Sequence, residues 1–150
     1  MKRLLLRLAI AASLLVVAIV LIAMLLLRAS LPDLEGDVTA SGLGAPAQIA
    51  RDADGIPVIT ASSREDLAFA TGYAHAQDRL WQMTTMRRTA QGRLSEVFGT
   101  ATVEVDTLVR RLDIYSLAVA SLDAQDERTL GILRAYATGV NARLDQINIQ

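Results

Sequence analysis

An uncharged apolar run near the N-terminus constrains this chain more than any other feature. Residues 8–27 carry no charge, and Ser13 is the only polar residue among these twenty. A helix of that length spans about 30 Å, which matches the hydrocarbon thickness of a bilayer. We therefore expect residues 1–28 to form a signal-anchor or transmembrane segment that enters the membrane through residues 8–27. A buried core helix is the alternative.

The charges beside this run predict its orientation. Lys2, Arg3 and Arg7 precede the run and only Arg28 follows it. Basic residues favour the cytoplasmic side, so we expect a single-pass protein of the inner membrane whose C-terminal part lies in the periplasm or outside. A cleaved signal has a shorter apolar core and small residues before the cut, whereas this run ends in leucines. Cleavage to a periplasmic or secreted form is the alternative.

The rest of the composition excludes several classes of function. The chain has no cysteine, which excludes disulfides and cysteine-based sites within it, and its single histidine argues against a histidine metal cluster. Without the four basic residues beside the apolar run, 11 of the 15 basic residues remain against 16 acidic ones. Nucleic-acid binding requires a basic surface, so we expect no nucleic-acid partner.

The segment after the membrane run is predicted to hold a β-hairpin. We expect residues 29–46 to form a stalk and a first strand near residues 37–41. Asp54-Gly55 separates two short apolar runs, and glycine accepts the positive φ that a tight turn requires. This places paired strands near residues 47–52 and 57–61. With the helices that follow, the expected fold class is α+β.

Helices are predicted for most of the remaining residues. Ser62 and Glu65 have the spacing of a capping box, so we expect a long helix from there to Gly92, followed by a short helical turn that ends at Gly99. The periodicity of Val105–Leu112 predicts a second helix, and Asp123 is expected to cap a third. The long helix carries two apolar stripes, Phe69, Tyr73, Ala76, Leu80 and Met83 on one side and Leu67, Ala70, Ala74 and Trp81 on another.

The sequence GYAHAQDRLWQM, residues 72–83, gathers the candidate functional side chains. His75 is followed by Asp78 and Arg79, and a His–Asp pair could orient an imidazole for base catalysis. No nucleophile is marked beside it, so we interpret His75 as held by a helix neighbour or a backbone carbonyl. Asp78 and Arg79 are expected to pair with other segments.

Two further groups are interpreted as structural. Trp81, Met83 and Met86 are expected to lie in the core. Asp52 and Asp54 are expected to serve the hairpin turn rather than bind a cation. From the residues alone, we predict no catalytic, cofactor-binding or metal-binding side chain in this chain.

The same residues carry a family resemblance. Three motifs carry it: Arg51-Asp52 with Gly55-Ile56-Pro57 in the hairpin, the run Ala76-Gln77-Asp78-Arg79-Leu80-Trp81-Gln82-Met83, and Arg87-Arg88 with Gly92 and Ser95-Glu96. Together they resemble the N-terminal part of the penicillin acylase (penicillin amidase) family. AYATGVNARLD, residues 135–145, resembles the next helix of that family. The resemblance covers about residues 47–145. Val58 stands where the family usually has histidine.

The resemblance implies an N-terminal-nucleophile hydrolase with an αββα fold, of which residues 47–150 form an incomplete N-terminal part. Family members are made as precursors, or zymogens, that cleave themselves into an α chain and a β chain. The N-terminal serine of the β chain is both nucleophile and base, since its α-amino group takes the hydroxyl proton. Backbone N–H groups and an asparagine side chain form the oxyanion hole. The substrates are amides of an acylated amine, such as β-lactam side chains or acyl-homoserine lactones, which connects the family to antibiotic metabolism.

The family's catalytic residues lie beyond the matching segment. None of the serines of this chain stands where the family has its nucleophile, and the ligands of the structural calcium that many members bind also come later. We therefore expect the remainder of a precursor, including the β chain, as partner, and no activity from these 150 residues alone. We expect residues 29–150, expressed alone, to aggregate or bind a hydrophobic dye. The alternative is a non-enzymatic, membrane-anchored helical module that binds a partner.

Overall fold

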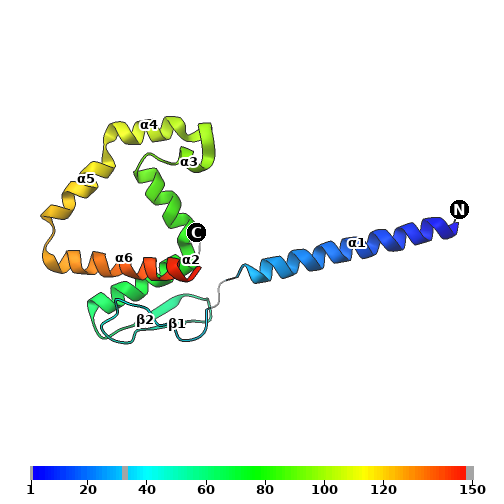
Figure 1. Cartoon of the computed structure of the whole chain (residues 1–150), viewed down its shortest axis with the longest axis horizontal. Helices are drawn as coiled ribbons and strands as arrows, with labels where there is room; N and C mark the ends of the chain where they lie inside the picture. Colours follow the sequence, from blue (N-terminus) through cyan, green and yellow to red (C-terminus); the bar gives the residue numbers. More distant parts are fainter. Residues whose placement is uncertain (1, 32–33, 148–150) are drawn as a thin grey trace. The chain divides into compact units, whose positions relative to one another are not determined.

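The computed structural model describes residues 2–31 and 34–147, which form two units, Met1–Asp37 and Val38–Gln150. Residues 32–33 of the expected stalk and residues 148–150 lie outside the described part. The described residues are mostly helical, with one two-stranded sheet (Figure 1). The α+β prediction is therefore confirmed at this level.

The first unit contains helix α1, Lys2–Ala29. Within it, Ile10–Ala29 has a mean hydropathy of 3.2 and none of it is buried in the protein. By length and composition this helix can cross a bilayer, and an N-terminal signal sequence has the same properties.

The hairpin forms where its turn residues predict it. Strand β1, Gln48–Arg51, pairs antiparallel with β2, Pro57–Thr60, and Ile49 faces Ile59. Asp52 closes the turn, because its Oδ1 accepts the backbone N–H groups of Asp54 and Ile56 at 3.0 and 2.8 Å. Gly55 has a φ of 79°, the conformation for which glycine was expected there.

The strand expected near residues 37–41 does not form; these residues have irregular structure. A short turn begins at Ser41, and Gly42 packs against Phe69 and Thr138, so a side chain on Gly42 would collide with them. The backbone N–H of Gly44 donates to Asp66. Side-chain contacts and this bond, rather than a strand ladder, hold the segment.

Helix α2, Arg64–Ala90, begins and ends close to the predicted positions, but its N-cap is one residue later than expected. The N-cap is Ser63, whose Oγ accepts the N–H of Asp66 at 2.9 Å, so the box uses Ser63 and Asp66 rather than Ser62 and Glu65. Asp66 is favoured because its carboxylate also holds Gly44. At the other end Gly92 adopts a φ of 62°, and the N–H of Arg93 donates to the Arg88 carbonyl, which is a Schellman cap.

The segment that follows runs through short helices, drawn from green to orange in Figure 1. They are α3 (Ser95–Phe98), η1 (Gly99–Thr102), α4 (Val103–Leu112), α5 (Ile114–Ala120) and η2 (Ser121–Ala124). The turn ending at Gly99 and the helix to Leu112 are confirmed, but α5 was not predicted. Asp123 lies in η2, so its predicted capping role is wrong. Helix α6, Glu127–Ile147, is instead capped by Asp126, which accepts the N–H of Thr129 at 2.7 Å.

The core of the described residues lies where α2 crosses α6. Its buried apolar residues all belong to α2: Phe69, Ala70, Tyr73, Ala74 and Ala76. The two backbones approach closely because a glycine lies on each side of the crossing. A Cβ on Gly72 would lie 2.1 Å from the Tyr136 carbonyl oxygen, and one on Gly139 would lie 1.9 Å from that of Phe69. The crossing therefore depends on both glycines.

Candidate functional site

Arg51 joins the hairpin to the long helix at the centre of the predicted site. Its guanidinium binds both oxygens of Asp78, at 2.7 and 3.0 Å, and also donates to Gln77 Oε1 and to the Gly55 carbonyl. The side chains of the pair are 18% and 29% exposed, and bidentate pairing fixes the guanidinium plane. The interpretation of Asp78 as part of an ion pair with another segment is confirmed.

His75 is exposed and does not pair with Asp78. Its Nδ1 lies 3.0 Å from the Tyr136 hydroxyl, and the two rings meet edge to face at 5.8 Å. The predicted partner, a helix neighbour or a backbone carbonyl, is therefore wrong. His75 contacts Tyr136 and Asp78 binds Arg51, so the two side chains do not form a His–Asp dyad in this arrangement.

Arg79 marks a break in α2. Its φ of −135° and ψ of 22° are not helical, and its guanidinium donates to Gln82 in the same helix. The prediction that Arg79 pairs with another segment is therefore wrong for the described residues. No proline or glycine lies at the kink. The kinked residue, Arg79, directly follows Asp78, whose carboxylate binds Arg51.

A surface hollow of about 650 Å³ lies beside these residues. It is lined by Arg51, Asp54, Gly55, Ile56, Pro57, His75, Asp78 and Arg79. None of these lining residues carries a hydroxyl or a thiol, and the hydroxyl that His75 contacts belongs to Tyr136, which is outside the lining. The lining therefore offers charged groups and an imidazole.

The aromatic end of the motif is not in the core of the described residues. Trp81 is 61% exposed and touches Phe98 edge to face at 6.2 Å, and Met86 is 64% exposed. The core interpretation is wrong for these two side chains, while Met83 is half-buried. The second stripe on α2 is likewise only partly covered, because Ala70 and Ala74 are buried but Leu67 is exposed.

Two buried carboxylates that we did not single out hold the ends of helices. Asp66 receives hydrogen bonds from the Ser63 hydroxyl and from Gly44, which lower its pKa against the effect of burial. Burial raises the pKa of Asp106, but hydrogen bonds from Ser95 and Leu94 and the charge of Arg110 outweigh it and leave the pKa lowered. Sequence spacing signals the first, since Ser63 and Asp66 form a capping pair, but Asp106 shows no local signal.

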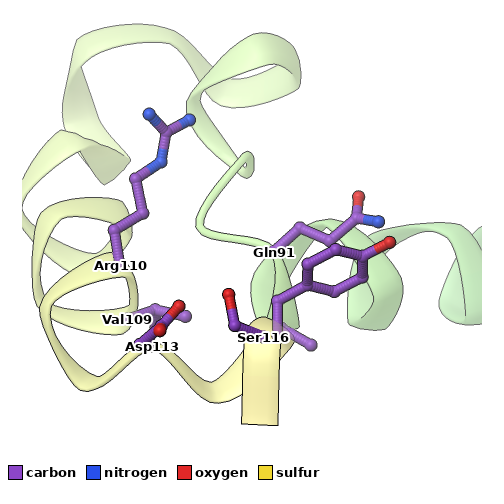
Figure 2. A pocket seen from close by; sticks show the side chains of 7 residues that line it. Gln91, Val109, Arg110, Asp113 and Ser116 are labelled. Atoms are coloured by element: carbon purple, nitrogen blue, oxygen red, sulfur yellow. The ribbon is translucent and has the colours of Figure 1, made fainter. Parts of the chain in front are cut away.

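A second, smaller hollow of about 180 Å³ lies where the end of α2 meets the turn between α4 and α5 (Figure 2). The oxygens of Asp113 and Ser116 approach the same space there, whereas the Arg110 guanidinium extends away from them. Arg110 Nε donates to the Gly92 carbonyl at 2.7 Å, which ties α4 to the cap of α2. The lining is polar, and we assign it no reaction.

Candidate metal ligands do not cluster among residues 2–31 and 34–147. No group of three or more His, Cys, Asp or Glu residues among them is placed to hold a metal ion.

Comparison with known proteins establishes the family. The family model for penicillin amidase matches residues 46–150, and the chain belongs to this family. It is 45% identical over 118 residues to the penicillin acylase 2 proenzyme of Pseudomonas sp. strain SE83, a match that covers 79% of this chain. It is also 39% identical over 115 residues to an acyl-homoserine lactone acylase, QuiP, of Pseudomonas fluorescens, over 77% of this chain.

The matches cover only the first part of much longer proteins. The chain spans 15% and 14% of those two relatives. Among solved structures, it resembles a thermostable penicillin G acylase from Alcaligenes faecalis, with a TM-score of 0.62 and 35% identity, covering 68% of this chain and 54% of that one. Residues 72–83 thus belong to a family segment that these relatives share.

Proposed function

We propose that this chain is the N-terminal part of the precursor of an amidohydrolase that cleaves the amide bond of an acylated amine. The β-lactam side-chain amides and acyl-homoserine lactones are the two substrate types we favour. The observation that carries the proposal is the family match over residues 46–150, together with relatives that are named acylases for both types.

In the proposed reaction, a serine at the N-terminus of a second chain, formed by self-cleavage, attacks the acyl carbon. Its own α-amino group takes the hydroxyl proton, and backbone N–H groups with an asparagine stabilise the oxyanion. The C–N bond breaks, the amine leaves with that proton, and water then hydrolyses the acyl ester to release the acid. This chain supplies none of the reacting groups, and its residues would position the elements that carry them. The complete enzyme, assembled from both chains, would have the αββα fold.

The geometry of the described residues supports a scaffold role. The side chains of the shared motif are occupied in holding segments together: Arg51 and Asp78 join hairpin to helix, and His75 contacts Tyr136. These contacts join the hairpin to α2 and α2 to α6, which supports a role for the motif in positioning these elements. We propose that any structural calcium is held by residues of the later part of the precursor.

We also propose that α1 anchors the enzyme in the inner membrane, with the folded part in the periplasm or outside. The mean hydropathy of 3.2 over twenty residues and the excess of basic residues before the apolar run support this orientation. The alternative, release into the periplasm after signal cleavage, predicts a mature protein that lacks α1. The mass of the mature protein distinguishes the two.

The function is tested with the full-length precursor expressed in an exporting host. Release of free amine is measured from phenylacetylated β-lactams and from acyl-homoserine lactones of short and long chains. We expect turnover of at least one class, and loss of turnover when the first serine of the second chain is changed to alanine. Absence of turnover on every amide, with the protein folded and stable, would favour the membrane-anchored interaction module instead.

A further inference from the structure

Helix α2 is kinked at Arg79, and its first half forms the core with α6. Arg79 has a φ of −135° and a ψ of 22°, whereas residues of an α-helix have about −63° and −42°. The change of direction along α2 is visible in Figure 1. The buried residues of α2, from Asp66 to Ala76, all precede the kink. Tyr73 in this half also donates its hydroxyl hydrogen to Gln146 of α6.

The second half of α2, residues 80–90, is attached to α4 instead. None of these eleven residues is buried. Gly92, which follows the helix, is buried against α4, where Arg110 Nε donates to its carbonyl at 2.7 Å. The kink therefore separates a half that belongs to the core from a half that leads to α3 and α4.

The residues of α2 near the kink do not explain it. Sharp kinks normally occur at proline, at glycine–serine pairs or at π-bulges. Residues 74–84 contain no proline, glycine or serine, and no π-turn occurs among them. Alanine, glutamine, arginine, leucine and methionine, which make up most of this stretch, all favour a continuous helix. The cause of the kink must therefore lie in a contact with another element.

Arg51 makes such a contact with the two residues that precede the kink. Its Nη2 donates to Gln77 Oε1 at 3.0 Å and to Asp78 Oδ1 at 2.7 Å, and its Nη1 donates to Asp78 Oδ2 at 3.0 Å. Nη1 also donates to the Gly55 carbonyl, which fixes the guanidinium to the hairpin turn. Successive side chains of a helix point about 100° apart, so one rigid group that binds both constrains the backbone between them. We propose that Arg51 sets the bend of α2 at Arg79 and so positions the second half of the helix.

This inference goes beyond the proposed activity and does not depend on it. A rival cause of the bend is the run of helices from α3 to α6, which leads from the second half of α2 back to its first half (Figure 1). The two causes make opposite predictions. If Arg51 sets the bend, α2 straightens when the guanidinium is removed, and if the run of helices sets it, the bend survives.

The test measures the bend with pairs of nitroxide labels on the whole 150-residue chain in detergent micelles. The chain has no cysteine, so two introduced cysteines direct the labels to chosen positions. Glu65 and Arg87 are exposed and lie on opposite sides of the kink, and on a straight helix their Cα atoms would be about 33 Å apart. We expect a shorter distance in the wild type, and an increase of several ångström toward about 33 Å in Arg51→Ala. A control distance, from Glu65 to Asn141 across the crossing of α2 and α6, reports whether the fold is kept.

Milder variants decide the question if Arg51→Ala also changes the control distance. Arg51→Lys keeps the charge without the fork, and Asp78→Asn removes the charge of the acceptor. Both should lengthen the distance across the kink by less than Arg51→Ala does. Arg134→Ala is the matched control, because it removes an arginine of α6 whose ion pair with Glu127 is exposed, and it should change neither distance. An unchanged distance across the kink in the Arg51 variants that keep the control distance would overturn the proposal and assign the bend to the run of helices from α3 to α6.

Discussion

Replacing Gly139 by alanine should loosen the crossing of α2 and α6. The new Cβ would lie 1.9 Å from the Phe69 carbonyl oxygen and 2.7 Å from its carbon. These are backbone atoms, which cannot rotate away, so the helices must separate. Overpacking of this kind costs about 3 kcal/mol at the upper end of its usual range. The better helix propensity of alanine returns up to about 1 kcal/mol, which leaves a net loss of about 2 kcal/mol.

Gly131 provides a matched control in the same helix. A Cβ on Gly131 meets nothing within 4 Å, so Gly131→Ala changes the helix propensity without a collision. It should stabilise the chain by about 0.5–1 kcal/mol. The two substitutions are chemically identical and differ only in their surroundings, so the opposite signs isolate the close approach of the helices.

Amide hydrogen exchange of the 150-residue chain in detergent micelles measures both effects locally. A loss of about 2 kcal/mol speeds the exchange of amides at the crossing about 30-fold, since 1.4 kcal/mol is a factor of ten. Gly131→Ala should leave those amides equally or better protected. Equal acceleration in both variants, or none in Gly139→Ala, would refute the argument that the glycine permits the crossing.

Three further predictions concern single side chains. Asp113 has a left-handed φ, which glycine accepts, so Asp113→Gly should be neutral or stabilise the chain by about 0.5 kcal/mol. Asp113→Val should destabilise it by about 2 kcal/mol, because a β-branched side chain is strained in that conformation. Urea unfolding followed by circular dichroism compares the two variants. Arg51→Lys keeps the charge but loses the fork that holds Asp78, so it should cost about 1 kcal/mol, seen as faster proteolysis of the hairpin than in the wild type. The pKa of Asp106 is lower in the folded chain than in the unfolded chain. The ionised carboxylate therefore stabilises the fold fully above the ordinary aspartate pKa of about 4, and this stabilisation is lost as the pH falls through the lower pKa of the folded chain. Asp106→Asn should therefore weaken the α3–α4 junction at pH 7 and flatten its acid dependence in hydrogen exchange; an unchanged acid profile would contradict this.

Local signals predicted the hairpin and the ends of α2. Gly55 and Gly92 have the positive φ that their positions required, and Ser63 caps the helix one residue later than expected. The shift has a tertiary cause, since Asp66 also binds Gly44, a residue 22 positions earlier. A rule that reads neighbouring residues cannot choose between two adjacent serines when a distant backbone group decides.

The missed features depend on contacts that no local pattern contains. Helix α5 was not predicted because its sequence is apolar without the alternation of a half-buried helix. His75 contacts Tyr136, 61 residues away, and the kink at Arg79 lacks the proline or glycine that usually signals one. Trp81 was assigned to the core because tryptophan beside methionines usually lies there, yet it is 61% exposed and among the described aromatic rings contacts Phe98.

The contacts of the candidate site were not predictable from the local sequence, since His75 contacts the hydroxyl of Tyr136 on another helix. The actual role of the motif, joining the hairpin to α2 through Arg51 and Asp78, needs the distance between segments that are 27 residues apart. A family resemblance detects such a motif because the family pattern contains both members of the pair, although they lie far apart in the sequence.

The most direct test of the proposed function is the mass and N-terminal sequence of the mature, folded protein that carries this chain, purified from an exporting host. We expect two chains, the first containing the α2 motif and the second beginning with serine, and release of amine from an acylated substrate by the pair. A single uncleaved chain that releases no amine from any amide offered would contradict the proposal that this protein is an acylase.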